Sequence, residues 1–425
     1  MKSKLHLLSL PLCLYSWVVL SLRSELIIVN GSSLQLNNLQ NVIVDDFDFD
    51  WYKTFCTETV ERVNFCNFLK RFDKEGMEGY RTRESLLKRF HIFVQNVNYV
   101  EDLNSFRGSR PDEDNAEYSA QFSPFGDLTP QEFERKILMK VHYNGNLHKV
   151  PVGSVTHMTK KLPKSFDWVQ RGKVTEIKDQ GSIGTCWAFS AVGVLEGQIA
   201  ISFNKKLNLS VEQLIECDSM ANRSSGDADC SEFGGWPYLA FEFLEKFGGI
   251  YSDNDWPYCA GTLDSKTKLP KCFPCMAKYY DKTSCGDHSD LYCNASTTLG
   301  QGPSGLCRQT TERSKLFAAK VKSWRTISSN ETELAYELVR TGPISVAMNA
   351  GPLQFYRRGV LNPRFCNSKS LNHAVLLVGY GGDDLPFWKV KNSWGVGFGE
   401  SGYFRIKRGA GKCGINMAAS TASIH

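Results

Sequence analysis

The sequence has little net charge and almost no long apolar runs. Lysine and arginine outnumber aspartate and glutamate by only five, for a net charge of +5, which is too small an excess to favour binding to nucleic acid. The apolar run near the N-terminus, Leu5–Leu22, follows Lys2 and Lys4 and is short for a bilayer span. We therefore expect a signal peptide over residues 1–21, with an uncleaved anchor as the alternative, and no membrane span after its removal.

The rest of the composition is typical of a folded, secreted protein. A chain of 425 residues, 42% hydrophobic and 22% charged, has ample core-forming material and exceeds the length of one ordinary domain. Its Asn-x-Ser/Thr sequons are candidate glycosylation sites and are consistent with secretion. They lie at Asn30, Asn208, Asn222, Asn294 and Asn330.

Segment 180–190, with the sequence QGSIGTCWAFS, combines a thiol with the start of a helix. Gly184 allows a tight turn and the apolar stretch 187–200 predicts a buried helix, so we expect Cys186 at a helix N-terminus. The helix macrodipole there favours a thiolate, the form of cysteine that attacks carbonyl carbon. A single buried cysteine is more often an inert core residue, so this segment needs partners to indicate a nucleophile.

Two later segments supply such partners. His373 lies in LNHAVLLVGY (371–380) and Asn392 lies in FWKVKNSWG (387–395). An imidazolium at His373 would pair with the Cys186 thiolate and then protonate the leaving amine. A lone histidine beside an apolar strand is usually a packing residue, but the three residues together indicate nucleophilic catalysis.

Cysteine, histidine and asparagine in this chain order resemble the papain-like cysteine proteases, and segments such as 341–350 and 373–380 resemble the cathepsin F branch most. The resemblance implies that Asn392 orients His373 and that Trp394 shields their hydrogen bond. It also implies an oxyanion hole formed by the Gln180 amide and the Cys186 N–H, with no cofactor and no metal. His373 and Asn392 follow Cys186 by 187 and 206 residues, against about 130–150 in the family.

The order of predicted elements is consistent with that family's fold. Residues 186–249 favour helices, one of them opened by a capping box at Ser210–Gln213. From residue 344 on, strands are favoured at 344–348, 374–378, 388–390 and 403–406. The resemblance implies an α+β, papain-like two-lobed fold, with Cys186 on a helical lobe and His373 on a β-barrel-like lobe. We expect this mature peptidase domain over residues 162–425, with the active site in the groove between the lobes.

A mainly helical propeptide is expected over residues 22–161, with an inhibitory domain at about 63–133. A stripe on a predicted helix resembles the ERFNIN pattern of family propeptides, although Ser85 stands where that pattern has Glu. The stripe is Arg89, Phe93, Asn96, Val100 and Asn104. Segment 121–133 resembles the second propeptide motif; an ordinary amphipathic helix and turn are the alternative. The propeptide would inhibit its own enzyme until carboxylates such as Asp127 are protonated.

By the same resemblance, Gly234 and Gly235 form a backbone strip that pairs with an extended substrate. The pocket for the second residue before the cut would be lined by Trp236, Pro237, Ala347, Ala374 and Ala418. Because Ala418 leaves this pocket neutral, we expect an apolar substrate residue there. Two positions depart from the family: Phe398 replaces an expected Trp on the primed side, and Cys230 lies two residues farther than usual from Gly234.

Ten cysteines remain for disulfides in the mature domain once Cys186 is set aside. The resemblance pairs Cys366 with Cys413 and joins Cys217 to Cys259 or Cys307, whereas Ile183 stands where relatives carry the partner of Cys230. An insertion at about 260–307 holds most of the others: Cys272, Cys275, Cys285, Cys293 and Cys307. Disulfides are expected there. A zinc site that includes His288 is the alternative, which an oxidising compartment disfavours.

Three functions fit these patterns. We favour a secreted or lysosomal cysteine endopeptidase made as a zymogen, monomeric, acting on protein and peptide substrates, with cystatin-type inhibitors as expected partners. The second is a carboxydipeptidase that uses the insertion to block one end of the groove. The third is an inactive binding homologue, which an intact Gln180, Cys186, His373 and Asn392 speak against.

Overall fold

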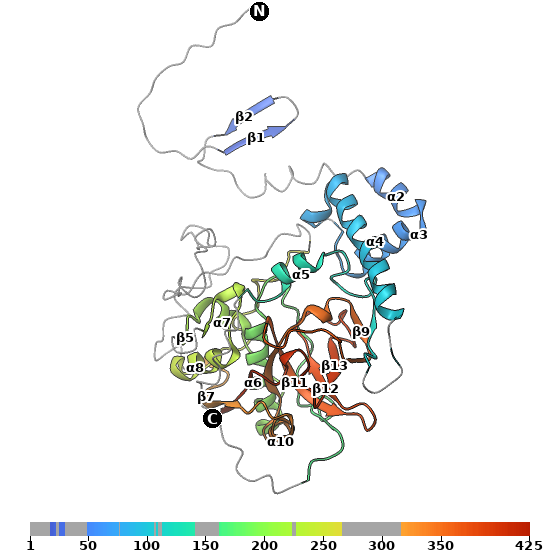
Figure 1. The fold of residues 1–425 in the computed structure, drawn as a ribbon. Coiled ribbons are helices and arrows are strands. Elements are labelled where there is room, and N and C mark those ends of the chain that lie inside the picture. Colours follow the sequence, from blue (N-terminus) through green and yellow to red (C-terminus); the bar gives the residue numbers. More distant parts are fainter. Residues whose placement is uncertain are drawn as a thin grey trace, which may run out of the picture. The chain divides into compact units, whose positions relative to one another are not determined.

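The computed structural model describes residues 18–22, 25–29, 49–75, 77–105, 108, 113–140, 161–222, 227–265 and 316–425. The chain divides into two units, residues 1–49 and 50–425. In the first unit, β1 (Val18–Leu22) pairs antiparallel with β2 (Glu25–Val29). The second unit contains every element that builds the site (Figure 1).

The segment expected to be a propeptide is mainly helical. Its helices are α2 (Phe49–Glu58), α3 (Val60–Arg71), α4 (Arg83–Ser105) and α5 (Pro130–Ile137), with a 3-10 turn η1 at Glu78–Tyr80. A disulfide between Cys56 and Cys66 joins α2 to α3. The rings of Phe55, Phe65 and Phe93 are buried against one another, so aromatic packing holds these helices together.

The predicted stripe on α4 holds the downstream propeptide segment. Arg89 makes two hydrogen bonds of 2.7 Å to the Glu132 carboxylate at the start of α5. Asn96 Nδ2 donates to the carbonyls of Gly126 (2.8 Å) and Leu128 (2.9 Å). Asn104 exchanges two hydrogen bonds with the backbone of Tyr118. Polar side chains at helical spacing therefore form hydrogen bonds with backbone groups of a segment that has few internal backbone hydrogen bonds.

The helical lobe is built on α6 (Cys186–Phe203), α7 (Val211–Cys217) and α8 (Pro237–Phe247). Ser210 Oγ accepts from Gln213 N at 3.1 Å, which is half of the predicted capping box. Among the described helices, α6 alone is long and apolar enough to cross a membrane. Its side chains are mostly buried in the core of this lobe, as for the central helix of a globular domain.

The second lobe is a sheet with the strand order β10-β13-β12-β11-β8-β14-β7. All its pairs are antiparallel except β10 with β13. The bounds are β7 Val321–Ile327, β8 Ile344–Met348, β10 Val360–Leu361, β11 His373–Gly381, β12 Phe387–Lys391, β13 Tyr403–Lys407 and β14 Ala419–Ile424. A short strand, β4 (Phe166–Asp167), pairs with β11. The sequence predicted strands at β8, β11, β12 and β13.

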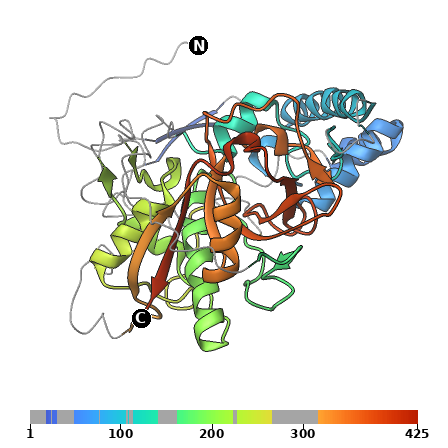
Figure 2. The ribbon, with the colours of Figure 1, turned by 60° about the horizontal axis from the view of Figure 1, so that its bottom comes forward.

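Short elements and one helix complete the unit. The short elements are β3 Glu117–Tyr118, β5 Ala221–Asn222, β6 Asp227–Ala228, β9 Tyr356–Arg358, η3 Ser231–Phe233, η6 Gly351–Leu353 and η7 Lys412–Gly414. Helix α10 (Glu331–Thr341) lies beside α6, where Gln198 Nε2 donates to Thr341 O at 2.7 Å (Figure 2). The two lobes meet where α6 packs on β11 and β8, which brings Cys186 beside the start of β11.

Candidate active site

Cys186 is the first residue of α6, as the sequence predicted. Its side chain is fully buried, and it is the one cysteine without a disulfide among the residues that the structure describes. The Sγ atom accepts a hydrogen bond of 3.4 Å from the backbone N–H of Ala374. The thiol therefore lies against the strand that carries His373.

His373 opens β11, and its ring is fixed on two sides. Nε2 lies 2.8 Å from Asn392 Oδ1, and the Trp394 indole stacks on the ring at 4.5 Å with an interplanar angle of 23°. Nδ1 is buried and has no hydrogen-bond partner among the described residues. Because Asn392 occupies Nε2, Nδ1 is the nitrogen left to exchange a proton with a thiol.

Gln180 is oriented by Ser393. Gln180 N donates to Ser393 O at 2.8 Å, and Ser393 Oγ donates to Gln180 Oε1 at 2.7 Å. With its oxygen held in this way, the amide must direct its N–H groups elsewhere. Nε2 donates to Ile183 O at 2.7 Å and to Ile137 O of the propeptide segment at 3.0 Å. The donor expected for an oxyanion thus binds a carbonyl oxygen.

Burial decides the charge states of Cys186 and His373 in this form of the chain. It raises the pKa of the Cys186 thiol to about 12, although backbone N–H groups oppose the shift. It lowers the pKa of His373 to about 4. Both groups are therefore neutral at pH 7 in this covered state, and the thiolate and imidazolium expected of the uncovered enzyme stay a prediction. Desolvation outweighs the helix macrodipole while the site is closed to water.

The propeptide segment that follows α5 closes the site. After Ile137, the backbone N–H of Met139 donates to Asn372 O and that of Lys140 donates to Phe233 O, both at 2.8 Å. Met139 is buried against the core that contains Cys186. This segment therefore takes up backbone acceptors beside His373 and beside Gly234, where a peptide substrate would bind.

Two family models match the chain, one for papain family cysteine proteases over residues 162–423 and one for the cathepsin propeptide inhibitor domain over residues 65–133. The chain belongs to the papain family of cysteine proteases. Cysteine proteinase 15A of Pisum sativum is 32% identical over 372 residues, which cover 85% of this chain and 86% of that protein. Cathepsin F of Mus musculus is 31% identical over 367 residues, which cover 85% and 66%.

Solved proenzymes of the family share the fold. The structure of digestive procathepsin L 3 of Tenebrio molitor larval midgut matches with a TM-score of 0.63 and 28% identity, covering 86% of this chain and all of that chain. The α+β papain-like fold, the peptidase family and the inhibitory propeptide domain predicted from sequence are confirmed.

In this papain-family protease, the predicted strip and pocket residues lie in three places. Gly234 has a φ of +134°, and a Cβ on Gly235 would lie 2.6 Å from Asp229 Oδ1, so both positions require glycine. Trp236, Ala347 and Ala418 share one apolar cluster, where Ala347 N donates to Ala418 O at 3.1 Å. The other two are not members of that cluster, but each is next to one of its members. Ala374 faces Ala347 across the β8–β11 ladder, and Pro237 is buried as the first residue of α8.

Sequence patterns did not single out three residues that contribute contacts at the site, Phe233, Asn372 and Asp229. Phe233 and Asn372 accept the propeptide backbone, and the Lys140 ammonium lies 4.9 Å from the Phe233 ring centre. Asp229 is buried behind the glycine strip and accepts from Trp236 N at 2.6 Å. The unusual spacing from Cys230 to Gly234 was the available signal, because Phe233 lies between these two residues.

The surface expected to bind the primed side of a substrate is aromatic. Trp394 contacts Phe398 edge-on at 4.8 Å, and both rings are buried. Phe125 and Phe133 of the propeptide domain also contact Trp394, at 5.0 and 5.6 Å. The Phe that replaces an expected Trp at position 398 therefore packs under Trp394, which in turn covers His373.

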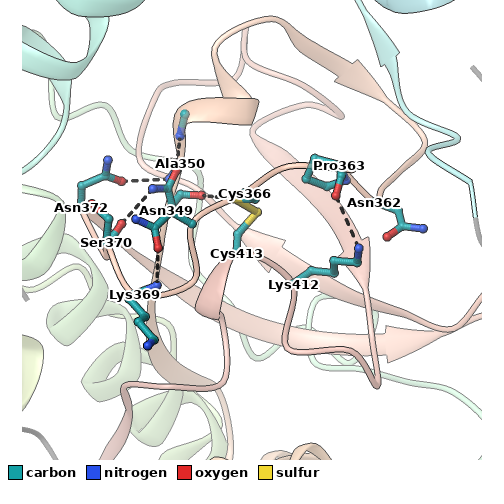
Figure 3. Close-up of a disulfide and its surroundings, with 12 residues drawn as sticks. Asn349, Ala350, Asn362, Pro363, Cys366, Lys369, Ser370, Asn372, Lys412 and Cys413 are labelled. Atoms are coloured by element: carbon teal, nitrogen blue, oxygen red, sulfur yellow. Dashed lines mark hydrogen bonds between the residues drawn. A yellow bond between two sulfur atoms is a disulfide. The ribbon is translucent and has the colours of Figure 1, made fainter. Parts of the chain in front are cut away.

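The predicted disulfide between Cys366 and Cys413 is present, with the Cα atoms 5.1 Å apart. It ties η7 to the loop that leads into β11, and Asn349 N donates to Cys413 O beside it (Figure 3). At the end of this loop, Asn372 Oδ1 accepts from Ala350 N at 2.9 Å. The bridge thus helps to fix the residue that precedes His373.

The other cysteine and glycosylation predictions fall partly outside the described residues. Cys217, Cys230 and Cys259 are each disulfide-bonded, while Cys272, Cys275, Cys285, Cys293 and Cys307 lie outside the described residues, as do Asn30 and Asn294. Asn208 and Asn330 are exposed and Asn222 is half-buried. Asn330 Oδ1 also caps α10.

The carboxylate that should make the propeptide sensitive to acid is Glu132 and not Asp127, as the pKa shifts of the two indicate. Burial raises the pKa of Asp127, which accepts from Lys74 Nζ at 2.9 Å and from Tyr80. A raised pKa means that protonation favours the folded state, so Asp127 is not the trigger we expected. Arg89 instead lowers the pKa of Glu132 to about 2. The stabilisation from this pair is complete above about pH 4.5 and is lost as the pH falls toward about 2.

We therefore expect the Glu132→Gln variant to lose its propeptide at a pH about one unit higher than the parent does. Glutamine preserves the capping box with Thr129, so the change removes the charge that Arg89 binds and little else. The measurement is the midpoint pH of propeptide loss on gels, with Glu134→Gln, an exposed neighbour on α5, as the control. An unchanged midpoint would show that this ion pair does not set the acid sensitivity.

Proposed function

We propose that the chain is a cysteine endopeptidase made as a zymogen, with Cys186 as nucleophile and His373 as general acid and base. The observation that carries this proposal is the buried, unpartnered Nδ1 of His373 beside a free thiol, with Nε2 held by Asn392. An inactive homologue has no need of a ring nitrogen kept free in this way, because an unpaired buried polar atom is costly.

The chemistry follows from these contacts. Once the propeptide leaves and water reaches the groove, the thiol proton can pass to His373 Nδ1, which gives a thiolate and an imidazolium. The thiolate adds to the scissile carbonyl carbon, and the oxyanion accepts from Gln180 Nε2 and the Cys186 N–H. His373 then protonates the leaving amine, which leaves an acyl enzyme. In the second half of the reaction His373 takes a proton from water, and the hydroxide oxygen displaces the thiolate from the acyl enzyme.

The insertion bears on the choice between endopeptidase and carboxydipeptidase. The chain enters it beside the active site, since Tyr258 OH donates to Gln180 O at 2.7 Å and Gly261 packs against the same carbonyl. Residues 266–315 lie outside the described residues, so an assay must decide. We expect the acid-matured enzyme to cut an internally quenched peptide equally well with a free or an amidated C-terminus. Loss of cleavage on amidation would identify a carboxydipeptidase, and no cleavage of either form would identify a binding protein.

An apolar preference at the second residue before the cut is also part of the proposal. Trp236, Ala347 and Ala418 present apolar surface without a charge. A guanidinium buried there would lack a carboxylate partner, which is costly. The proposed setting is the secretory pathway or the lysosome, and the disulfides support it. A monomer inhibited by cystatin-type proteins remains part of the proposal.

We expect Ala418→Glu to raise kcat/KM for substrates with Arg at that position by about tenfold or more, because the new carboxylate pairs with the guanidinium. Ala418→Gln is the matched control, since it adds the same bulk without charge. The measurement is kcat/KM for paired Arg and Leu peptides with each variant. Equal cleavage of both peptides by the parent would place the pocket elsewhere.

A further inference from the structure

The propeptide domain binds the mature domain at a second place, outside the groove. There β3 pairs antiparallel with β9, with Glu117 opposite Arg358 and Tyr118 opposite Tyr356. Ser119 N extends the contact by donating to Phe355 O at 2.7 Å. In the described part of the chain, β3 is the one strand that pairs with β9. Removal of the propeptide therefore leaves β9 as an unpaired strand edge.

The contact also includes side chains of the bound segment. The Glu117 carboxylate is held by two arginines, Arg357 at 2.6 Å and Arg358 at 2.7 Å, and is mostly buried between them. Toward the N-terminus, Asn115 Oδ1 accepts from Val360 N at 3.1 Å, and Asp114 Oδ1 accepts from Asn362 N at 2.9 Å. Each polar side chain of the segment 114–117 thus meets a donor that belongs to the mature domain.

Backbone geometry on the mature side is shaped for this close approach. Gly359 has a φ of +97°, and a Cβ there would lie 2.6 Å from Asn115 O. Ala116 of the bound segment is fully buried, so a small residue is required at that position. β9 is itself anchored to the sheet, because Arg405 N on β13 donates to Tyr356 OH at 3.2 Å. The site therefore belongs to a fixed part of the mature lobe, labelled β9 in Figure 1.

We propose that the mature enzyme uses this vacated edge, residues 355–362, as a second binding site for extended acidic segments of its protein substrates. The bound segment would add a strand to β9 and place a carboxylate between Arg357 and Arg358. The pattern that fits is acidic or amide, amide, small, then glutamate, as in Asp114-Asn115-Ala116-Glu117. Because the groove contacts involve Gln180, Phe233 and Asn372 instead, one substrate chain can occupy both places.

This inference depends on the proposed function in one respect: the propeptide must be removed before the site becomes free. Binding at a second site adds affinity by raising the local concentration of the scissile segment. It should therefore lower KM for proteins that carry the acidic pattern and leave kcat unchanged. Short peptides that fill only the groove should gain nothing.

The test uses acid-matured enzyme whose Cys186 has been alkylated, so that the probe is not cut. A fluorescent peptide of sequence EDNAEYSA, matching residues 113–120, should bind saturably by fluorescence anisotropy, more weakly as salt rises. The Arg357→Ala, Arg358→Ala double variant should bind it at least about tenfold more weakly. Arg364→Ala, an exposed arginine nearby, is the control and should bind like the parent. The peptide EDNAKYSA, with lysine at the position of Glu117, should not bind.

Activity separates failure of this inference from failure of the proposed function. The non-alkylated double variant should hydrolyse a short groove peptide at the parental kcat and KM, which also shows that it folds. Its KM for a protein reporter that carries DNAEY should rise about tenfold toward that for a reporter carrying KNAKY. Absence of saturable peptide binding, or equal loss in Arg364→Ala, would overturn the second site while leaving the peptidase assignment untouched.

Discussion

Replacing Cys186 with alanine should abolish peptide hydrolysis, with a loss of at least about 10⁴-fold in kcat/KM. The Sγ atom is the nucleophile, and no other cysteine is free among the described residues. Alanine keeps the helix propensity of α6, so the variant should fold and should still bind its propeptide through Gln180, Asn372 and Phe233.

The variant must be matured by added parent enzyme, because it should not process itself. Turnover of the quenched peptide is then compared with that of Ser190→Ala. Ser190 lies one turn along α6 and bonds Ser345 and Val375, so that control loses buried polar contacts without losing the nucleophile. It should keep turnover within about tenfold of the parent. The lost hydrogen bonds lower the free energy of unfolding by about 1–3 kcal/mol each, but every reacting atom is still present. Residual activity of Cys186→Ala in that same range would exclude the thiol as nucleophile.

The places of the three proposed catalytic residues in the fold could be predicted from sequence because they depend on local patterns. Cys186 at the start of an apolar helix, His373 at the start of an apolar strand and Asn392 after a third strand are all found where periodicity placed them. Strand β7 and the contacts of Phe233 could not be predicted from sequence. Both depend on which distant segment lies alongside: β7 joins the sheet through β14, and Phe233 matters because Lys140 and Gly234 lie next to it.

Charge states were the least predictable property of the site. The helix macrodipole and an imidazolium at His373 can both be expected from sequence, and both favour a thiolate. Neither of these accounts for the propeptide segment at residues 137–140, which covers the groove and removes the water that charged groups need. Burial then raises the pKa of Cys186 and lowers that of His373. In the proposed mechanism, latency thus has two causes: the groove is blocked, and Cys186 and His373 are neutral.

Gln180→Ala should lower kcat/KM by about 10²–10³, the usual cost of losing one oxyanion donor. The Cys186 N–H would remain as the other donor, so measurable activity should persist, unlike in Cys186→Ala. The same amide donates to Ile137 O in the zymogen. The substitution should therefore also weaken inhibition of the mature enzyme by added propeptide, by about two- to tenfold, as expected for one hydrogen bond.

Ser393→Ala tests whether the orientation of this amide matters as well as its presence. Ser393 Oγ holds Gln180 Oε1 at 2.7 Å, and without it the amide can rotate and offer its oxygen to the oxyanion. We expect a loss in kcat smaller than that of Gln180→Ala, with little change in KM, because the fault appears only when charge develops on the substrate oxygen. The measurements are kcat and KM for one quenched peptide with the parent and both variants. If Gln180→Ala raised KM alone and left kcat intact, Gln180 would be a substrate-binding residue and the oxyanion would have to be stabilised by other groups.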